Sequence, residues 1–139
     1  MDLNRLLKKL PHKFPMLMLD EVLEADDKMA LTRSIIKTSN PFIKKDNTLS
    51  EFAFIELMAQ TVAVQVGFVY DSSDQKAPSV GFLLGLKPFE CHSQLSLNDE
   101  VVVTAFLEHS FDNLKIFRCT VKKEEKVIAM GVLKIYEQH

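Results

Sequence analysis

The stretch FAFIELMAQTVAVQVGFVY, residues 52–70, constrains the fold more than any other part of the chain. At helical spacing it is apolar on almost every side, and a helix of that kind is normally buried all round. We expect Ser50 to cap this helix and Glu51 to lie in its first turn, where a negative charge suits the helix dipole. One Glu and two Gln interrupt the stretch, so it is a poor membrane span. The sequence therefore predicts a central helix that the rest of a soluble domain surrounds.

Strand-like segments lie on both sides of this helix in the sequence. Residues 2–10 fit a short amphipathic helix, and residues 16–25 and 29–38 are expected to form two strands. After the central helix, apolar and polar residues alternate between short turns, which indicates antiparallel strands. Four long strands are expected there: one after Pro78, then 101–109, 114–121 and 127–136.

This order of elements predicts an α+β fold in which an antiparallel sheet of about six strands wraps round one helix. Such a sheet covers the helix on several sides but not on all of them. The remaining helix surface needs a partner. So does the second face of the last strand, which is also apolar and holds Ile128, Met130 and Val132. We expect a single domain over residues 1–139 that forms a dimer or a larger oligomer.

Composition excludes several classes of function. The 139 residues carry a formal net charge of −2, lack Trp and form no basic stripe, so a nucleic-acid partner is not expected. The N-terminus lacks the apolar segment of a signal peptide, which makes the cytoplasm the default location. Cys91 and Cys119 have no metal-ligand spacing and are expected to be buried free thiols. No two histidines have the spacing of a metal pair, so neither a metal nor another cofactor is expected.

Glu56 is the most informative residue, because it lies inside the apolar helix between Ile55 and Leu57. A carboxyl group at this position must either be desolvated or open into a cavity. Desolvation favours the neutral form of a carboxyl group, which would suit a general acid or base. A structural carboxylate, bonded to backbone groups or to an Arg across a dimer, fits the position equally well.

Two further polar residues are candidates for the same site. Gln60 lies one turn after Glu56 on the same helix face. It could orient Glu56, although satisfying a loop carbonyl is the favoured interpretation. His12 lies between Pro11 and Pro15, which restrict the backbone around it. Its imidazole suits proton transfer near neutral pH, but an isolated loop histidine is more often solvated.

Three stretches together resemble a known family. They are LPHKFPMLMLDEVLEAD (10–26), FIELMAQTVAVQVG (54–67) and VGFLLGLKPFECHSQLSLNDEVVV (80–103). They are similar to the bacterial 3-hydroxyacyl-acyl-carrier-protein dehydratases of the hotdog superfamily, over nearly the whole chain. The helix motif Glu-Leu-Met-Ala-Gln, residues 56–60, looks most like that of the dehydratase-like proteins of aryl polyene clusters.

The resemblance implies a hotdog fold and the removal of water from a 3-hydroxyacyl thioester, giving a trans-2-enoyl product. It also reveals a departure. Related dehydratases carry a catalytic His in a His-Phe-Pro-Gly loop before the helix, whereas here residues 41–52 read PFIKKDNTLSEF. Three explanations stay open: His12 supplies the imidazole, Glu56 acts alone with a water, or a partner chain provides the His. The assignment adopted is His12 as base and Glu56 as acid, with Gln60 in support.

The same resemblance suggests the other parts of the site. Backbone N–H groups at the helix start could hold the developing enolate oxygen, and large apolar side chains could line a tunnel for the acyl chain. The candidates are Ser50, Glu51 and Phe52 for the first role, and Phe54, Met58, Phe82 and Phe89 for the second. Each of the large apolar residues is more often simply core.

Two other functions compete with dehydration. A hotdog thioesterase would use the helix carboxylate to activate water, and a non-catalytic subunit would bind a second hotdog chain without turnover alone. The expected substrate carrier is an acyl carrier protein or coenzyme A. Basic residues could dock an acidic carrier protein, although solvated charge is the commoner explanation: Lys8, Lys9, Lys13, Lys44 and Lys45.

Overall fold

The computed structural model describes residues 2–73, except 11–15, and residues 79–138, except 84–88. For residues 79–83 it describes the backbone. The elements in chain order are a 3₁₀ helix η1 (Leu3–Lys9), β1 (Glu21–Ala25), β2 (Met29–Ile35), α1 (Phe52–Ser72), β3 (Ser79–Leu83), β4 (Phe89–Cys91), β5 (Glu100–Phe111), β6 (Leu114–Lys123) and β7 (Lys126–Gln138).

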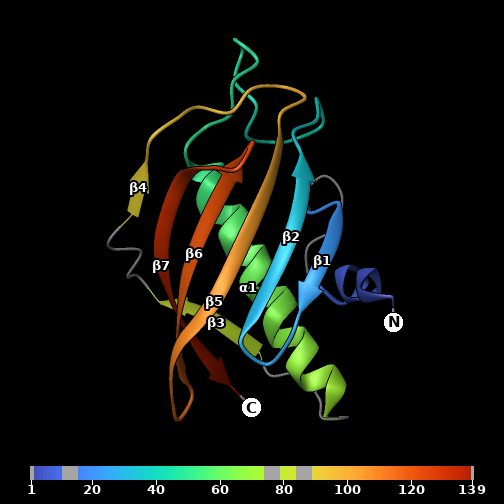
Figure 1. The fold of residues 1–139 in the computed structure, drawn as a ribbon, viewed down its shortest axis with the longest axis vertical. Coiled ribbons are helices and arrows are strands. Elements are labelled where there is room, and N and C mark those ends of the chain that lie inside the picture. The colour runs from blue at the N-terminus through green and yellow to red at the C-terminus, as the bar shows by residue number, and fades with distance from the viewer. Residues whose placement is uncertain (1, 11–15, 74–78, 84–88, 139) are drawn as a thin grey trace.

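The strands form one antiparallel sheet that curls round the helix. Its order is β1-β2-β5-β6-β7-β3, and the short β4 pairs with another part of β7. Figure 1 shows β2, β5, β6 and β7 lying across one side of α1, with η1 beside β1. The predicted architecture of about six strands round one central helix is confirmed.

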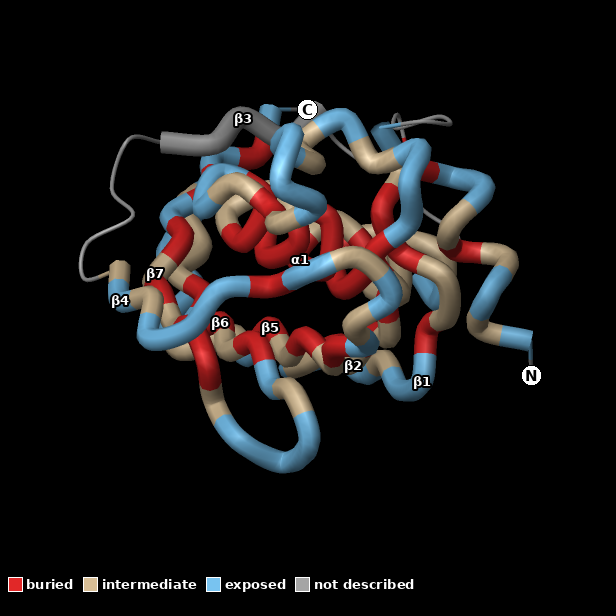
Figure 2. Tube along the Cα trace, turned by 90° about the horizontal axis from the view of Figure 1, so that it is seen from above, coloured by how far each residue is buried: buried red, intermediate tan, exposed pale blue. Residues whose placement is uncertain are grey.

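The core lies between the concave face of the sheet and α1. On β5 the residues Val101, Val103 and Ala105 are buried, while the residues between them are partly exposed. Because successive side chains of a strand point to opposite faces, this alternation gives the sheet one face toward the helix. Figure 2, seen from above, shows buried segments concentrated between the sheet and α1.

The helix is apolar because most of it is core. It is long and apolar enough to cross a membrane by length and composition alone, with a mean hydropathy of 1.6, but 61% of that window is buried inside the domain. Polar side chains on its buried side bond other elements: Thr61 bonds Thr32 on β2 at 2.9 Å, and the Gln65 amide Nε2 donates to the Asp26 carbonyl at 3.1 Å. The sheet covers α1 on several sides but leaves one side partly open, as expected.

Several element boundaries differ from the predictions. The first helix is 3₁₀ rather than α, with Asp2 capping it by a bond to the Asn4 amide at 2.9 Å. The first strand begins at Glu21 rather than at residue 16. The reason is that the backbone of Met16 and Met18 bonds the side chain of Gln60 on α1.

Two burial predictions were also wrong in part. Ile128 is 3% exposed and so does not share the outer face with Met130 and Val132. A register shift in the pairing of β6 with β7 near Val121 is the reason. Beyond this shift, the side chains of β7 exchange the faces to which they point. Cys119 is buried as predicted, whereas Cys91 is only half-buried.

Candidate active site

Glu56 lies about one turn into α1, on the side of the helix that the sheet leaves open. The side chain of Glu56 is half-buried, whereas Phe52, one turn earlier, is 72% exposed. A fully buried carboxyl group, the first of the two predicted possibilities, is therefore not what the structure has. Glu56 can meet solvent or a ligand at the open side.

Gln60 connects Glu56 to the segment that precedes β1. Its amide Nε2 donates to the Glu56 Oε1 at 3.0 Å and to the Met16 carbonyl at 2.8 Å. Its Oε1 accepts from the Met18 amide at 2.9 Å, and the residue is 0% exposed. An amide group with these three partners has its orientation fixed. Both predicted contacts of Gln60, to the carboxylate and to a loop carbonyl, are therefore present together.

His12 lies outside the described residues, and its role as base stays a prediction. The structure describes the chain again from Met16 onward. Met16 follows His12 by four residues, and its carbonyl is held against Gln60. Met16 and Met18 are thus bonded to α1 one turn from Glu56.

A stripe of small residues continues along the open side of α1. At helical spacing, Ala59, Ala63 and Gly67 follow Glu56 on the same side. Ala63 and Gly67 are half-buried, and a Cβ built on Gly67 would meet no atom within 4 Å. Ala59 is buried at 8% exposed, so we call Glu56, Ala63 and Gly67 the open stripe. The repeated small residues were a signal in the sequence that our reasoning missed.

The helix start differs by one residue from the prediction. Glu51 occupies the cap position and makes no side-chain capping bond, so the expected cap Ser50 lies one residue further out. The Ser50 carbonyl accepts from the Ala53 amide at 3.0 Å, and its own amide already donates to the Phe42 carbonyl at 2.9 Å. The Phe52 amide makes only a long bond of 3.4 Å to the Ser50 Oγ. Of the three proposed oxyanion donors, Ser50 is therefore already occupied.

The residues proposed for an acyl tunnel have different surroundings. Phe54 and Met58 are 1% and 0% exposed and belong to the packed core, and Phe89 on β4 is half-buried against it. The side chain of Phe82 lies outside what the structure describes. Phe54 and Met58 are therefore core residues in this structure.

Part of the predicted basic surface is engaged inside the chain. Lys9 and Arg5 of η1 both bond the Asp71 carboxylate near the end of α1, the latter at 2.5 Å. The hydrogen bonds from Lys9 and then Arg5 hold the pKa of Asp71 below its ordinary value. These contacts fix η1 to α1. Lys8, Lys44 and Lys45 are exposed, and Lys13 lies outside the described residues.

Comparison with solved structures identifies the fold. Over its full length the chain is similar to the dehydratase heterocomplex ApeI:P from Xenorhabdus doucetiae, with a TM-score of 0.87, 20% identity and 92% of that chain covered. A hypothetical thioesterase with coenzyme A from Streptococcus pneumoniae has a TM-score of 0.67 at 9% identity, covering 86% of this chain and 88% of its own. At these identities the likeness concerns the fold alone, which is the hotdog fold.

Sequence comparison then gives the family. The family described as ApeP-like, ApeP dehydratase, matches residues 5–139. The 3-hydroxyacyl-[acyl-carrier-protein] dehydratase FabZ of Streptococcus equi subsp. zooepidemicus is 23% identical over 137 residues, covering 96% of this chain and 95% of that protein. The chain is thus a hotdog protein of the hydroxyacyl-thioester dehydratase group. Within that group it belongs to the ApeP-like dehydratase family.

Proposed function

We propose that the chain dehydrates a 3-hydroxyacyl thioester, carried by an acyl carrier protein, to a trans-2-enoyl thioester in fatty-acid or polyene-type lipid biosynthesis. The observation that supports this most is the position of Glu56. The Glu56 carboxylate accepts a hydrogen bond from Gln60 at 3.0 Å, and it lies on the open stripe. Family membership supports the reaction class.

The reaction needs two proton transfers. In the proposed mechanism the His12 imidazole removes the proton alpha to the thioester carbonyl, and the Glu56 carboxyl group gives a proton to the hydroxyl at C3. The C–O bond then breaks, water leaves, and a double bond forms between C2 and C3. Backbone N–H groups of Glu51 and Phe52 at the start of α1 would hold the developing enolate oxygen.

The open stripe suggests where the acyl chain lies. Along α1 from Glu56, the half-buried residues Ala63 and Gly67 carry no bulky side chain, and this run is the proposed path of the acyl chain. A second hotdog chain placed over this path would close it into a tunnel and exclude water from Glu56. We therefore propose that the working site forms between two chains, either two copies of this one or this chain and a second hotdog protein.

The alternative of a non-catalytic subunit has a specific basis. Residues 41–52, where related dehydratases carry their catalytic His, contain none here. In addition, the similar structure from Xenorhabdus doucetiae is a heterocomplex. A partner chain would then supply the imidazole, and this chain would supply the surface of α1. A hotdog thioesterase, with Glu56 activating water, is the second alternative.

The test is turnover of a 3-hydroxyacyl thioester on carrier protein by the purified chain, followed by mass spectrometry. We expect the enoyl product, and we expect His12→Ala to remove it. Free acid would show a thioesterase instead. If the chain alone gives no reaction, and enoyl product forms only after a second hotdog chain is added, the chain is a subunit of a heteromeric enzyme. Unchanged turnover in His12→Ala would exclude His12 as the base.

A further inference from the structure

Tyr70 is the next large side chain along the side of α1 that carries the open stripe. At 100° per residue, Glu56, Ala63, Gly67 and Tyr70 lie within an arc of about 60° on the helix. The structure describes every residue from Glu56 to Tyr70, and within this arc the two between them are the small Ala63 and Gly67. The proposed path of the acyl chain therefore runs toward Tyr70, which is half-buried.

A buried ion pair fixes the hydroxyl of Tyr70. This hydroxyl donates to the Glu137 Oε2 at 2.6 Å, and the Lys115 Nζ lies 2.5 Å from the other oxygen of the same carboxylate. Glu137 is 3% exposed, and the Lys115 Nζ lies 5.8 Å from the centre of the Tyr70 ring. The three side chains come from α1, β7 and β6, so the ring is held between the helix and the sheet. Figure 1 shows β7 ending at the same end of the molecule as the last turns of α1.

A ring that is fixed in this way does not move aside for a ligand as a solvated tyrosine does. An alkyl chain that continued past Tyr70 would have to break the bond to Glu137 and leave a buried carboxylate with one donor fewer. It would also bring methylene groups against the charges of Lys115 and Glu137, which an apolar chain cannot solvate. The far end of the path is therefore unfavourable for a longer chain.

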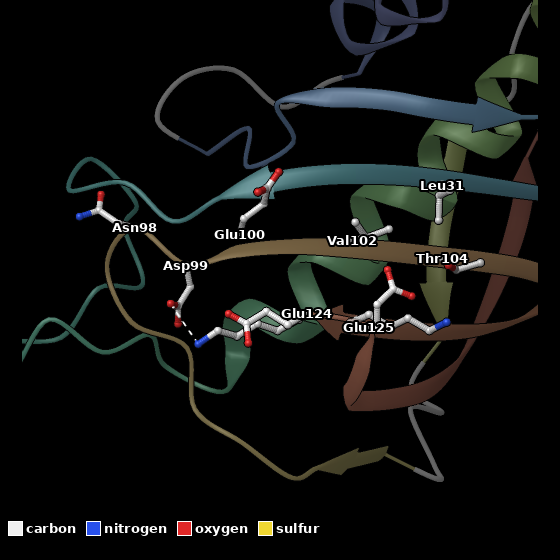
Figure 3. A pocket seen from close by; sticks show the side chains of 10 residues that line it. Leu31, Asn98, Asp99, Glu100, Val102, Thr104, Glu124 and Glu125 are labelled. Atoms are coloured by element: carbon white, nitrogen blue, oxygen red, sulfur yellow. Dashed lines mark ion pairs between the residues drawn. The ribbon is translucent and has the colours of Figure 1, made fainter.

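The groove on the outer face of the sheet does not suit an acyl chain. It has a volume of about 660 Å³, and six charged side chains line it beside Leu31, Val102 and Thr104 (Figure 3). It lies on the face that points away from α1, and so away from Glu56. An apolar chain in this groove would remove charged groups from water without pairing them. The side of α1 that carries the open stripe is the better place for the chain.

We propose that the ring of Tyr70 ends the path of the acyl chain and so sets the longest chain that the site accepts, an inference that rests on the proposed function. Tyr70 follows Glu56 by 14 residues, which is about 21 Å along the helix axis. Long side chains of a helix lean toward its N-terminus, so the Glu56 carboxyl group and the Tyr70 ring are displaced in the same direction. Their separation along the axis is therefore kept.

This separation gives an upper limit for the length of the acyl chain. A fully extended chain advances about 1.2 Å per bond, as an extended peptide backbone does. With about 4 Å taken up by the contact between the chain end and the ring, roughly 14 carbons fit beyond C3. The substrate class is thus a straight acyl chain of up to about 16–18 carbons.

The test is the affinity of the purified chain for S-alkyl coenzyme A thioethers of even length from 8 to 22 carbons, measured by isothermal titration calorimetry. A thioether is neither dehydrated nor hydrolysed, so the measurement reports binding alone. In the wild type we expect each added pair of carbons to raise the affinity by about tenfold while it enters the path. The affinity should stop rising at about 16–18 carbons.

Two variants move this limit in opposite directions. Tyr70→Ala removes the ring and should raise the limit by at least about two carbons. Gly67→Leu should lower it by about four carbons, because Gly67 precedes Tyr70 by three residues, about 4.5 Å. Gly67→Leu is also compatible with the fold, since a Cβ at this position meets no atom within 4 Å and leucine suits a helix better than glycine.

Tyr136→Ala is the matched control. Tyr136 precedes Glu137 on β7, is 40% exposed and points to the other face of the sheet, so its removal should keep the wild-type limit. An unchanged limit in Tyr70→Ala or in Gly67→Leu overturns the proposal, and so does the absence of binding at every length. A shift in Tyr136→Ala equal to that in Tyr70→Ala overturns it as well.

The failure of this proposal is distinguishable from the failure of the proposed function. Enoyl product is measured separately, on 3-hydroxyacyl thioesters of the same lengths. A length limit that moves in both variants, without enoyl product from any thioester, keeps the role of Tyr70 and removes the dehydration. Enoyl product from every length, with no limit near 16–18 carbons, keeps the dehydration and overturns the role of Tyr70.

Discussion

At the scale of single residues, Gln60 shows what the sequence could and could not predict. Its spacing from Glu56 indicated that the two side chains share a helix face, and the bond of 3.0 Å is present. The sequence could not indicate that the same amide group also bonds Met16 and Met18, because those partners are more than 40 residues away. Long-range backbone contacts of this kind carry no local pattern. They explain why the segment before Glu21 is not a strand.

A buried cluster near the other end of α1 was also invisible in the sequence. Tyr70 donates to Glu137 at 2.6 Å, and Lys115 lies 2.5 Å from the same carboxylate. Glu137 is 3% exposed. Burial, and then the bond to Glu137, raises the pKa of Tyr70 to about 12 from its ordinary value of 10.0.

Replacing Tyr70 with Phe tests this cluster. Because the buried carboxylate loses a donor, we expect Tyr70→Phe to lower the free energy of unfolding by about 1–2 kcal/mol near pH 8. The stability linked to the raised pKa of Tyr70 is present below pH 10 and is lost as the pH rises toward 12. Urea unfolding at pH 8 and at pH 11 measures both effects. A variant as stable as the wild type at pH 8 would show that Glu137 does not depend on Tyr70.

At the scale of elements, the central helix was the most predictable part. Its apolar composition indicated burial, and its length and position agree with residues 52–72. Its start was off by one residue, because Ser50 contributes through its carbonyl more than through its hydroxyl. The outward position of Ile128 was wrong because a register shift in β6–β7 pairing cannot be read from alternation alone.

Two phenylalanines of this helix provide a matched pair for stability. Phe54 is 1% exposed and Phe52 is 72% exposed, on the same turn of α1. We expect Phe54→Ala to cost about 3–5 kcal/mol, through lost burial and the cavity left behind. Phe52→Ala should change the free energy of unfolding by no more than about 0.5 kcal/mol. Urea unfolding at one protein concentration compares them. A small loss in Phe54→Ala would instead suggest that Phe54 lines a space open to the acyl chain.

At the scale of the whole molecule, the sheet separates two surfaces. The open stripe of α1 lies on one side, and the outward residues of the sheet, such as Val102, Thr104 and Phe106 of β5, lie on the other. The sequence predicted that both the helix and the last strand need partners, and both surfaces are left partly exposed. It could not predict the groove of about 660 Å³ that Leu31, Val102 and Thr104 line, because that shape depends on two turns and on three neighbouring strands.

The proposed dehydration depends on the chemical role of Glu56. The most direct test is the rate of enoyl-thioester formation by Glu56→Gln, measured by mass spectrometry in whichever assembly is active. The control is Glu24→Gln, an exposed glutamate on β1. If Glu56 gives its proton to the leaving hydroxyl, Glu56→Gln should lower the rate by about 10²–10⁴-fold, while Glu24→Gln keeps the wild-type rate. A Glu56→Gln variant that forms enoyl product at the wild-type rate would exclude Glu56 as the acid of the reaction.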